Sequence, residues 1–314
     1  MLSGGGWTDG LPYERACAWL ADRYPMIASG LLPNVDGSPA TRALAERVLE
    51  LYRTKAGRED VDLARGLEAF ARISFDFIRL QARFTKTGVY RSSEARKIVE
   101  ELYLDAGRME GYYLDGLLLT YAFWPNHAKM LRFLCEEFLP SLGPAPRVLE
   151  LGVGHGLMAY LTLSERDDTR YAGVDLSPSS LRYADELLRR SGVEQERFEL
   201  CRGDAAKSTG ISAAEGEPFD ACLCCEVLEH VEVPGRVLAR MGSLLAPGGR
   251  AYVTTVANIE AEDHIFLFHD AHHIRRSLEE EGFRIERDLV LPLHGMEGRS
   301  PEPINYAAVL RFAG

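Results

Sequence analysis

The segment Glu150-Leu-Gly152-Val-Gly154-His-Gly156 decides the fold, and it directly follows the apolar run at residues 147–151. Glycines at alternate positions permit a tight turn from a strand into a helix and let a ligand lie against bare backbone. A dinucleotide-binding turn would have the spacing G-x-G-x-x-G, but Leu157 stands where its last glycine belongs. The acidic Glu150 is poorly suited to a nearby pyrophosphate and well suited to a cationic ligand. The segment therefore predicts a Rossmann-like strand, turn and helix.

Downstream of this turn, short apolar runs alternate with segments that are mostly long enough for helices. Such alternation is typical of a mostly parallel sheet with helices on both faces. The last two runs follow each other without a helix, which predicts an antiparallel hairpin at one edge. We thus expect an α/β fold with a seven-stranded Rossmann-like sheet, from the runs at residues 147–151, 171–176, 198–204, 219–225, 250–256, 287–293 and 305–312.

Upstream of the turn, apolar residues recur every three or four positions, which predicts an all-helical N-terminal cap. We expect helices at residues 41–54, 62–84, about 110–123 and about 127–138, and a further helix through residues 98–102 that begins at Ser93. Three prolines within residues 140–146 separate the two patterns. We therefore expect a helical cap or lid domain at residues 1–140 and a Rossmann-like domain at residues 147–314.

The formal charge of −11 is unevenly distributed along the chain. Residues 1–140 have 18 Lys/Arg against 19 Asp/Glu, whereas residues 141–314 have 18 against 28. Neither half has the basic surplus that binding to nucleic acid or to an anionic membrane requires, so we expect neither partner.

The apolar and cysteine-containing stretches indicate a cytoplasmic protein. No apolar run reaches the roughly 18–20 residues that span a bilayer. The first residues lack the basic and then apolar pattern of a secretion signal. Cys222, Cys224 and Cys225 lie in an apolar run that suits a buried strand in a reducing compartment.

The glycine segment and four later features resemble the motifs of the class I S-adenosylmethionine (SAM) dependent methyltransferases. E-x-G-x-G-x-G after the first strand is similar to motif I of that family. Further matches follow in order: Asp175 at the end of the second predicted strand, Gly203-Asp204-Ala205 after the third, Glu226-Val-Leu-Glu-His230-Val after the fourth, and Pro247-Gly248-Gly249 before the fifth. The resemblance covers about residues 145–314 and implies SAM as the cofactor. The alternative is a Rossmann domain for another nucleotide.

The resemblance also implies roles for individual residues. The carboxylate of Asp175 can accept hydrogen bonds from both ribose hydroxyls of SAM, and Asp204 corresponds to the family's acceptor for the adenine amino group. The implied cofactor-binding set is Glu150, Gly152, Gly154, Gly156, Asp175, Leu176, Asp204, Ala205 and Glu226.

Residues after the fourth and fifth strands lie at the edge of the sheet where ligands bind. His230 is either a general base or a histidine with a local hydrogen bond at a strand–helix junction. Asn258 lies on the loop after the fifth strand, with Glu260, Asp263 and His264. Four histidines, His264, His269, His272 and His273, crowd this region. Since Asp270 is typical of a helix N-cap and the residues after it of a first helical turn, we expect no metal site.

An aromatic segment at residues 112–127 lies shortly before the glycine turn, so the chain can fold it over the SAM pocket. Aromatic faces attract a cation such as the SAM sulfonium by about 0.5–2 kcal/mol each. The alternative is ordinary helix packing. The candidate catalytic residues are Tyr112, Tyr113, Tyr121, Trp124, His230 and Asn258.

Three functions fit these features. The first is methyl transfer to a small molecule such as a secondary metabolite, which depends mainly on positioning for in-line displacement. The second follows from the W-P-x-H end of the aromatic segment, which resembles the cap of azetidine-2-carboxylate synthases. In those enzymes the amino group of SAM attacks its own γ-carbon and methylthioadenosine leaves. The third is a non-catalytic SAM-binding protein. The acceptor and the oligomeric state, a homodimer included, do not follow from the sequence.

Overall fold

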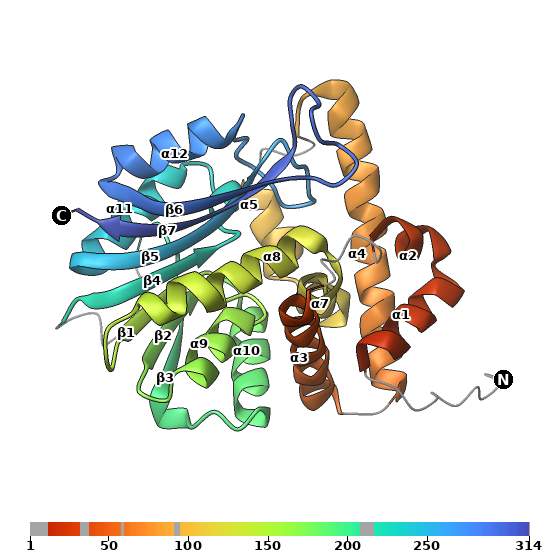
Figure 1. Cartoon of the computed structure of the whole chain (residues 1–314), viewed down its shortest axis with the longest axis horizontal. Helices are drawn as coiled ribbons and strands as arrows, with labels where there is room; N and C mark the ends of the chain where they lie inside the picture. Colours follow the sequence, from red (N-terminus) through yellow and green to blue (C-terminus); the bar gives the residue numbers. More distant parts are fainter. Residues whose placement is uncertain (1–11, 32–37, 58–59, 91–94, 208–216, 314) are drawn as a thin grey trace.

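The computed structural model describes residues 12–31, 38–57, 60–90, 95–207 and 217–313. A seven-stranded sheet has helices on both faces, and a group of N-terminal helices lies beside it (Figure 1). The predicted fold class is therefore confirmed. The predicted N-cap Ser93 lies outside the described residues.

The sheet has the strand order β3-β2-β1-β4-β5-β7-β6. Its strands are β1 (Arg147–Leu151), β2 (Arg170–Asp175), β3 (Phe198–Arg202), β4 (Phe219–Cys225), β5 (Leu245–Ala257), β6 (Phe283–Pro292) and β7 (Ile304–Phe312). The first five pair in parallel, and β7 is antiparallel to both β5 and β6. The predicted hairpin at the edge is thus confirmed. The chain runs from β1 outward to β3 and then crosses back to β4, so the strand order reverses between β1 and β4.

Alternate residues of each strand face two separate hydrophobic cores. Val148 packs with α9 (Leu157–Glu165) and α10 (Pro178–Arg190), whereas Leu149 packs with α11 (Pro234–Leu244) and α12 (Ala271–Glu280). Cys222 and Cys225 lie in opposite cores, and all six cysteines are free. Burial in the sheet, rather than disulfide or metal chemistry, accounts for the cysteines of β4.

The N-terminal helices follow the predicted pattern with longer bounds. They are α1 (Pro12–Arg23), α2 (Pro25–Leu31), α3 (Pro39–Ala56), α4 (Asp60–Thr87), α5 (Ala95–Ile98), α6 (Ala106–Arg108), α7 (Leu114–Phe123) and α8 (Pro125–Phe133). Short π-helical turns separate or extend them at Val99–Tyr103 (η2), Met109–Tyr113 (η3) and Leu134–Phe138 (η4). The helix expected over residues 110–123 is therefore a π-turn continued by α7.

Helix α7 is the centre of this helical group, and every residue in it except Leu117 is buried. The Phe123 ring lies 4.9 Å from that of Phe70 and 5.6 Å from that of Tyr13. Gly116 lets α7 approach α4 closely, because a Cβ atom there would lie 2.8 Å from the carbonyl oxygen of Ala69. The hydroxyl of Tyr183 on α10 donates to the buried Asp115 at 2.7 Å and so ties α7 to the other half of the chain.

Helix α8 and η4 lie on the same face of the sheet as α9 and α10 (Figure 1). Tyr252 of β5 donates its hydroxyl to the carbonyl of Met130 at 2.7 Å, and its ring lies 5.6 Å from that of Phe138. One hydrophobic core thus extends from the N-terminal helices to the sheet. The division into domains at residues 140–146 stays a prediction.

One local prediction is corrected. Pro247-Gly248-Gly249 does not precede the fifth strand, because β5 begins at Leu245 and includes these residues. Its pairing with β4 shifts in register between Phe219 and Ala221, where the partner passes from Leu245 to Arg250. The Pro-Gly-Gly turn is therefore the irregular start of a strand.

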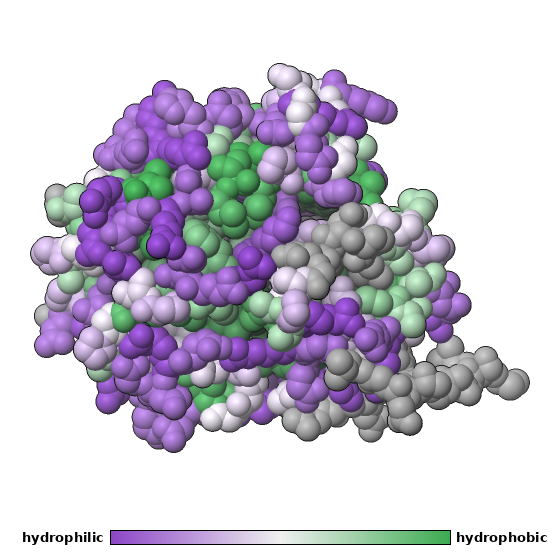
Figure 2. All heavy atoms as spheres, viewed as in Figure 1, coloured by the Kyte–Doolittle hydropathy of each residue, from purple (hydrophilic) through white to green (hydrophobic). Residues whose placement is uncertain are grey.

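The face of the molecule seen in Figure 2 is mostly polar. Figure 2 shows that hydrophilic residues cover most of the face in view, with smaller hydrophobic patches between them. Within the described ranges, no helix is both long enough and apolar enough to cross a bilayer.

Replacing Gly116 by alanine tests the close approach of α4 and α7. We expect Gly116→Ala to lower the free energy of unfolding by about 1–3 kcal/mol, because a backbone carbonyl cannot move aside cheaply. Gly111→Ala is the matched control in the same region, since nothing lies within 4 Å of a Cβ atom there. Thermal unfolding compares the two variants, and equal stability of Gly116→Ala and the wild type would contradict the packing described.

Candidate functional site

A cavity of about 640 Å³ lies between the carboxyl ends of the central strands and the N-terminal helices. Its floor consists of residues that follow β1, β2, β3 and β4, and its cover comes from α4, η2, η3 and α7. The volume is typical of a site for a small organic ligand. This position, at the reversal of strand order, is where doubly wound sheets bind ligands.

The glycine segment forms the turn between β1 and α9. Gly152, Gly154 and Gly156 all have positive φ angles, of 85°, 53° and 77°. A Cβ atom on Gly152 would lie 2.4 Å from Val227, and one on Gly156 would lie 2.8 Å from Ala184 of α10. Gly154 has no such neighbour and lines the cavity. Two of the glycines therefore serve packing as well as conformation, and the middle one leaves bare backbone toward the cavity.

Asp175 organises the turns around the cavity. Its Oδ2 accepts the N–H of Gly154 at 2.8 Å, and its Oδ1 accepts the N–H of Ser177 at 2.8 Å. Asp204 lies beside it after β3 and forms an ion pair with Lys207 at 2.9 Å. Both carboxylates line the cavity.

Glu150 contributes a buried carboxyl group at the end of β1. It is 1% exposed, and its partner among the described residues is the hydroxyl of Tyr171, which donates to it. Burial raises the pKa of Glu150 to about 8, and the nearby Asp175 adds to the effect. A second cavity carboxyl group, Glu226, follows β4 with a strained positive φ of 52°. Burial and the adjacent Glu229 raise the pKa of Glu226 to about 8.

Aromatic side chains of the N-terminal helices form the opposite wall. The ring of Tyr121 lies 5.5 Å from His155 of the glycine turn and 4.9 Å from His127. Trp124 lies 5.0 Å from His127 and donates its indole N–H to Ser74 at 3.3 Å. Burial lowers the pKa of His127 to about 3, so this imidazole is neutral at physiological pH.

The loop after β5 is tied to the cap through Asp263. Tyr103 donates its hydroxyl to Oδ2 of Asp263 at 2.7 Å, and Tyr113 donates to the same atom. Arg108 forms a further ion pair with Glu262. Burial opposes ionisation, but His230, His264 and the two hydroxyls together lower the pKa of Asp263 below its usual range. The two tyrosine hydroxyls therefore hold the loop against the helices.

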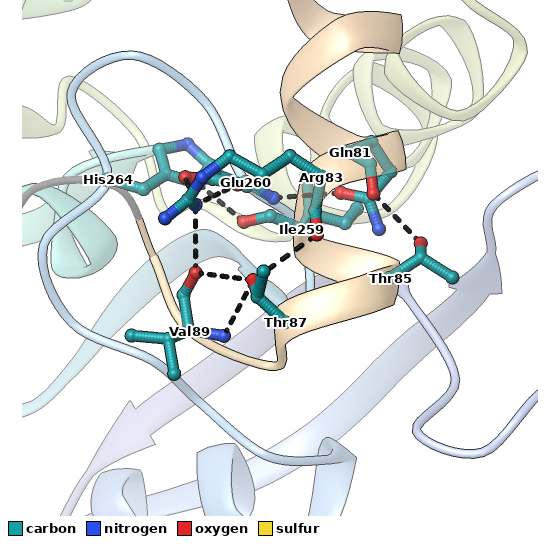
Figure 3. Close-up of polar contacts among 8 residues, drawn as sticks. All are labelled: Gln81, Arg83, Thr85, Thr87, Val89, Ile259, Glu260 and His264. Atoms are coloured by element: carbon teal, nitrogen blue, oxygen red, sulfur yellow. Dashed lines mark hydrogen bonds and ion pairs between the residues drawn. The ribbon is translucent and has the colours of Figure 1, made fainter.

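The C-terminal end of α4 is bonded to the same loop (Figure 3). Arg83 donates to both carboxylate oxygens of Glu260, at 2.9 and 3.1 Å. Gln81 donates to the carbonyl of Asn258 at 3.0 Å and accepts the N–H of Glu260 at 2.9 Å. These bonds fix the cover of the cavity to the loop.

The structure brings most of the predicted residues into one cavity. Tyr112, Tyr113, Tyr121, Trp124 and His230 line it together with Glu150, Gly152, Gly154, Asp175, Leu176, Asp204, Ala205 and Glu226. Gly156 and Asn258 are not among the lining residues. The amide of Asn258 instead donates to the carbonyls of His269 and Glu302, at 2.6 and 3.0 Å, so it joins loops and corrects the prediction that it faces the reaction.

Sequence reasoning missed Tyr103, Phe77 and Leu80 as lining residues. Phe77 and Leu80 belong to the apolar pattern of the helix predicted at residues 62–84, and no local motif marks Tyr103. One face of Tyr112, which was predicted, is covered by the guanidinium of Arg72 at 3.8 Å from the ring centre. That face is therefore closed to another cation.

The four clustered histidines do not form one group. The ring of His264 is buried 5.1 Å from that of His230, whereas His269 and His273 stack on each other at 5.4 Å beside α12. Asp270 caps α12 by accepting the N–H of His273 at 2.7 Å, as predicted.

The part of the chain that forms most of the sheet is similar to known methyltransferases. A family model described as a methyltransferase domain matches residues 149–251. A ubiquinone biosynthesis O-methyltransferase of Paraburkholderia phymatum is 32% identical over 132 residues, which cover 42% of this chain and 53% of that protein. The protein of the same description from Xylella fastidiosa is 33% identical over 110 residues, which cover 35% of this chain and 42% of that protein. The chain thus spans about half the length of these curated relatives.

A solved structure supports the fold. Phosphoethanolamine N-methyltransferase 2 of Haemonchus contortus, in complex with SAM, aligns over 71% of this chain and 61% of its own, with a TM-score of 0.52 and 16% identity. The ordered motifs, the cavity at the strand reversal and these matches agree. Residues 149–251 thus match a methyltransferase domain, and the fold around them is similar to that of a SAM-dependent methyltransferase.

Proposed function

We propose that this protein transfers the methyl group of SAM to a small molecule enclosed beneath the helical cap. One observation supports this most: the cavity joins the glycine turn and the carboxylates at the carboxyl ends of β1, β2 and β3 to an aromatic wall from the cap. A cofactor and an acceptor that share such a space are held close together, and methyl transfer depends mainly on that positioning.

In this proposal the floor of the cavity binds SAM. Asp175 accepts the ribose hydroxyls and Asp204 accepts the adenine amino group, while Gly152 and Gly154 leave room for the cofactor against the backbone. Carboxyl groups of the cavity offset the positive charge of the sulfonium. Leu176 and Ala205 lie beside these carboxylates and contact the nucleoside.

The cap and the loops bind the acceptor. The rings of Tyr121 and Trp124, and those of Tyr112 and Tyr113 farther along the wall, exclude water from the transferred methyl group. His230 is the proposed base, because its Nδ1 lies 3.0 Å from the carbonyl of Asp263 and must carry the proton there, which leaves Nε2 as the basic atom. The acidic balance of the chain supports a small-molecule acceptor over a nucleic acid.

A second candidate is the intramolecular cyclisation of SAM. The observation in its favour is that the ring of Tyr121 lies near His155 of the glycine turn, so the aromatic wall reaches the backbone against which SAM is proposed to lie. In this reaction the amine nitrogen forms a bond to Cγ, the Cγ–S bond breaks with its electron pair going to sulfur, and the amine loses a proton. The products are azetidine-2-carboxylate and methylthioadenosine.

Calorimetry tests the ribose assignment. Asp175→Ala should weaken SAM binding by about 100-fold or more, because two charge-assisted hydrogen bonds are lost and the glycine turn loses an acceptor. Asp185→Ala is the matched control on α10, since Asp185 forms a surface ion pair with Arg189 and does not line the cavity. Wild-type affinity in Asp175→Ala would refute the assignment.

The pH dependence of stability tests whether ionisation of the buried Glu150 carboxyl group destabilises the ligand-free fold. Such a cost would be expected of a group that is kept there to bind a ligand. The raised pKa of Glu150 means that the folded, ligand-free protein prefers the protonated form, so this stabilisation is complete below about pH 4.5 and is lost as the pH rises through 8. Glu150→Gln cannot ionise and keeps an acceptor for Tyr171. We expect the variant to gain stability over the wild type by about 1.4 kcal/mol for each pH unit between these limits, and to bind SAM more weakly.

Thermal unfolding of both proteins from pH 5 to pH 9 measures this difference. Parallel stability curves for Glu150→Gln and the wild type would show that the carboxyl group ionises at no cost in the fold.

Incubation of the pure protein with SAM alone, followed by mass spectrometry, separates the two reactions. Methyl transfer predicts no rapid product until an acceptor is added, after which S-adenosylhomocysteine forms. Methylthioadenosine and a cyclic amino acid without any acceptor would refute methyl transfer and establish cyclisation. SAM binding without turnover under either condition would instead indicate a non-catalytic SAM-binding protein.

A further inference from the structure

Three side chains with metal-binding atoms converge beside the cavity. Glu229 and His230 lie in the turn η8 (Leu228–His230) after β4, and His264 lies in the loop after β5. One ligand atom from each of the three lies within 4.8 Å of the other two. The backbone fixes this approach, because the carbonyl of Glu229 accepts the N–H groups of Ile265 and Phe266 at 2.7 and 2.9 Å.

Both imidazoles are oriented in the way that metal ligands require. Nδ1 of His264 lies 2.7 Å from the carbonyl of Ile259, a contact drawn in Figure 3, and Nδ1 of His230 lies 3.0 Å from the carbonyl of Asp263. Since a carbonyl only accepts, each Nδ1 carries the proton and each Nε2 keeps a free lone pair. Metal-ligating histidines in proteins usually donate their second ring N–H to such a carbonyl or carboxylate.

The third ligand is a buried carboxylate with an unused oxygen. Glu229 is 0% exposed, and its Oε2 accepts the hydroxyl of Thr255 at 2.7 Å. Its Oε1 and the Oε1 of Glu226 are buried and accept from no other described residue, and the two carboxyl groups share a hydrogen bond when one of them is protonated. Within those residues, no lysine or arginine forms an ion pair with either carboxylate. Buried charge without a partner is costly, so this pair of carboxyl groups requires a proton or a cation.

We propose that Glu229, His230 and His264 form a binding site for a divalent transition-metal cation. Two imidazole nitrogens and one carboxylate oxygen suit zinc, iron(II) or cobalt(II) better than magnesium or calcium, which prefer oxygen ligands. Glu226 lies beside this set as a further oxygen donor.

The site opens toward the cavity. His230, His264 and Glu226 line it, so a cation held by these residues has its remaining coordination positions on the ligand side. An acceptor oxygen could occupy such a position and lose its proton more easily there; this role rests on the proposed function, whereas the metal site itself does not. When a cation is bound, Nε2 of His230 coordinates it. His230 then does not act as the base that the proposed function assigns to it.

Metal titration of the full chain tests the proposal without any turnover. The protein is treated with a chelator, exchanged into metal-free buffer, and titrated with Co²⁺ and then Zn²⁺ by calorimetry and visible absorption. We expect one equivalent of Co²⁺ per chain, with the d–d absorption of a nitrogen- and oxygen-ligated ion, and its displacement by Zn²⁺.

Two variants and one control locate the ion. Glu229→Gln keeps an acceptor for Thr255, and His264→Gln keeps a side chain that can bond within the loop; each should weaken Co²⁺ binding by tenfold or more. His273→Ala removes a histidine of the His269–His273 pair near the surface and should leave the affinity unchanged. Thermal unfolding and SAM binding show that each variant is folded.

The outcomes are distinct. Loss of binding in folded Glu229→Gln and His264→Gln, with retention in His273→Ala, supports the site. Absence of stoichiometric binding in the wild type, unchanged binding in both variants, or loss in His273→Ala would overturn it. Because Co²⁺ binding is measured without SAM or acceptor, a failure here leaves the methyl-transfer proposal standing, and the reverse also holds.

Discussion

The reversal of strand order between β1 and β4 is the constraint on which the rest of the molecule depends. Connections from β1 and β4 leave toward opposite sides, so nothing in the sheet itself closes the crevice between their carboxyl ends. The N-terminal helices close it instead. Asp115 of α7, held by Tyr183, and the two tyrosines on Asp263 bind this cover to both flanks of the crevice. The cavity is therefore a product of two separate parts of the chain.

Closing the crevice creates an electrostatic problem, because several carboxyl groups are buried there. The hydrogen-bond donors that stabilise these carboxyl groups differ from one position to the next. Asp175 is stabilised by two backbone N–H groups, and Glu150 by a tyrosine hydroxyl. Glu229 has a threonine hydroxyl on one oxygen only. Asp263, in the loop after β5, accepts two tyrosine hydroxyls. Compensation is therefore uneven, and the carboxyl groups with an unpaired oxygen among the described residues of the site are Glu226 and Glu229, next to the two imidazoles.

The fold and the floor of the cavity were predictable because their signals are local. A strand, a glycine turn and a carboxylate at each strand end are contiguous in the chain, and parallel strands bring those ends to one edge. Asp175 and Glu226 therefore line the cavity as expected. The cover of the cavity was not predictable in the same way. Tyr103 and Asp263 meet across 160 residues, and nothing in either local segment marks the partner.

Asn258 is a residue whose position in the chain suggests a place in the site, although its side chain bonds elsewhere. Its position after β5 is where active-site residues are common, but its positive φ of 56° and its bonds to distant carbonyls give it a structural task. Gly156 was placed correctly in the motif, yet it contacts α10 rather than the cavity. A motif thus fixes where a residue lies along the chain, whereas the direction of its side chain depends on what packs against it.

The position of α8 on the sheet has a consequence for how the chain acquires its structure. Met130 is bonded to Tyr252, 122 residues later, and Asn126 to Asn305, 179 residues later. During synthesis the apolar face of α8 therefore emerges long before β5 and β7, the strands that cover it. Contacts of such large sequence separation form slowly, and exposed apolar surface favours aggregation in the meantime. Helix α8 is made early, yet its contacts with the sheet form only after β5 and β7 have been made.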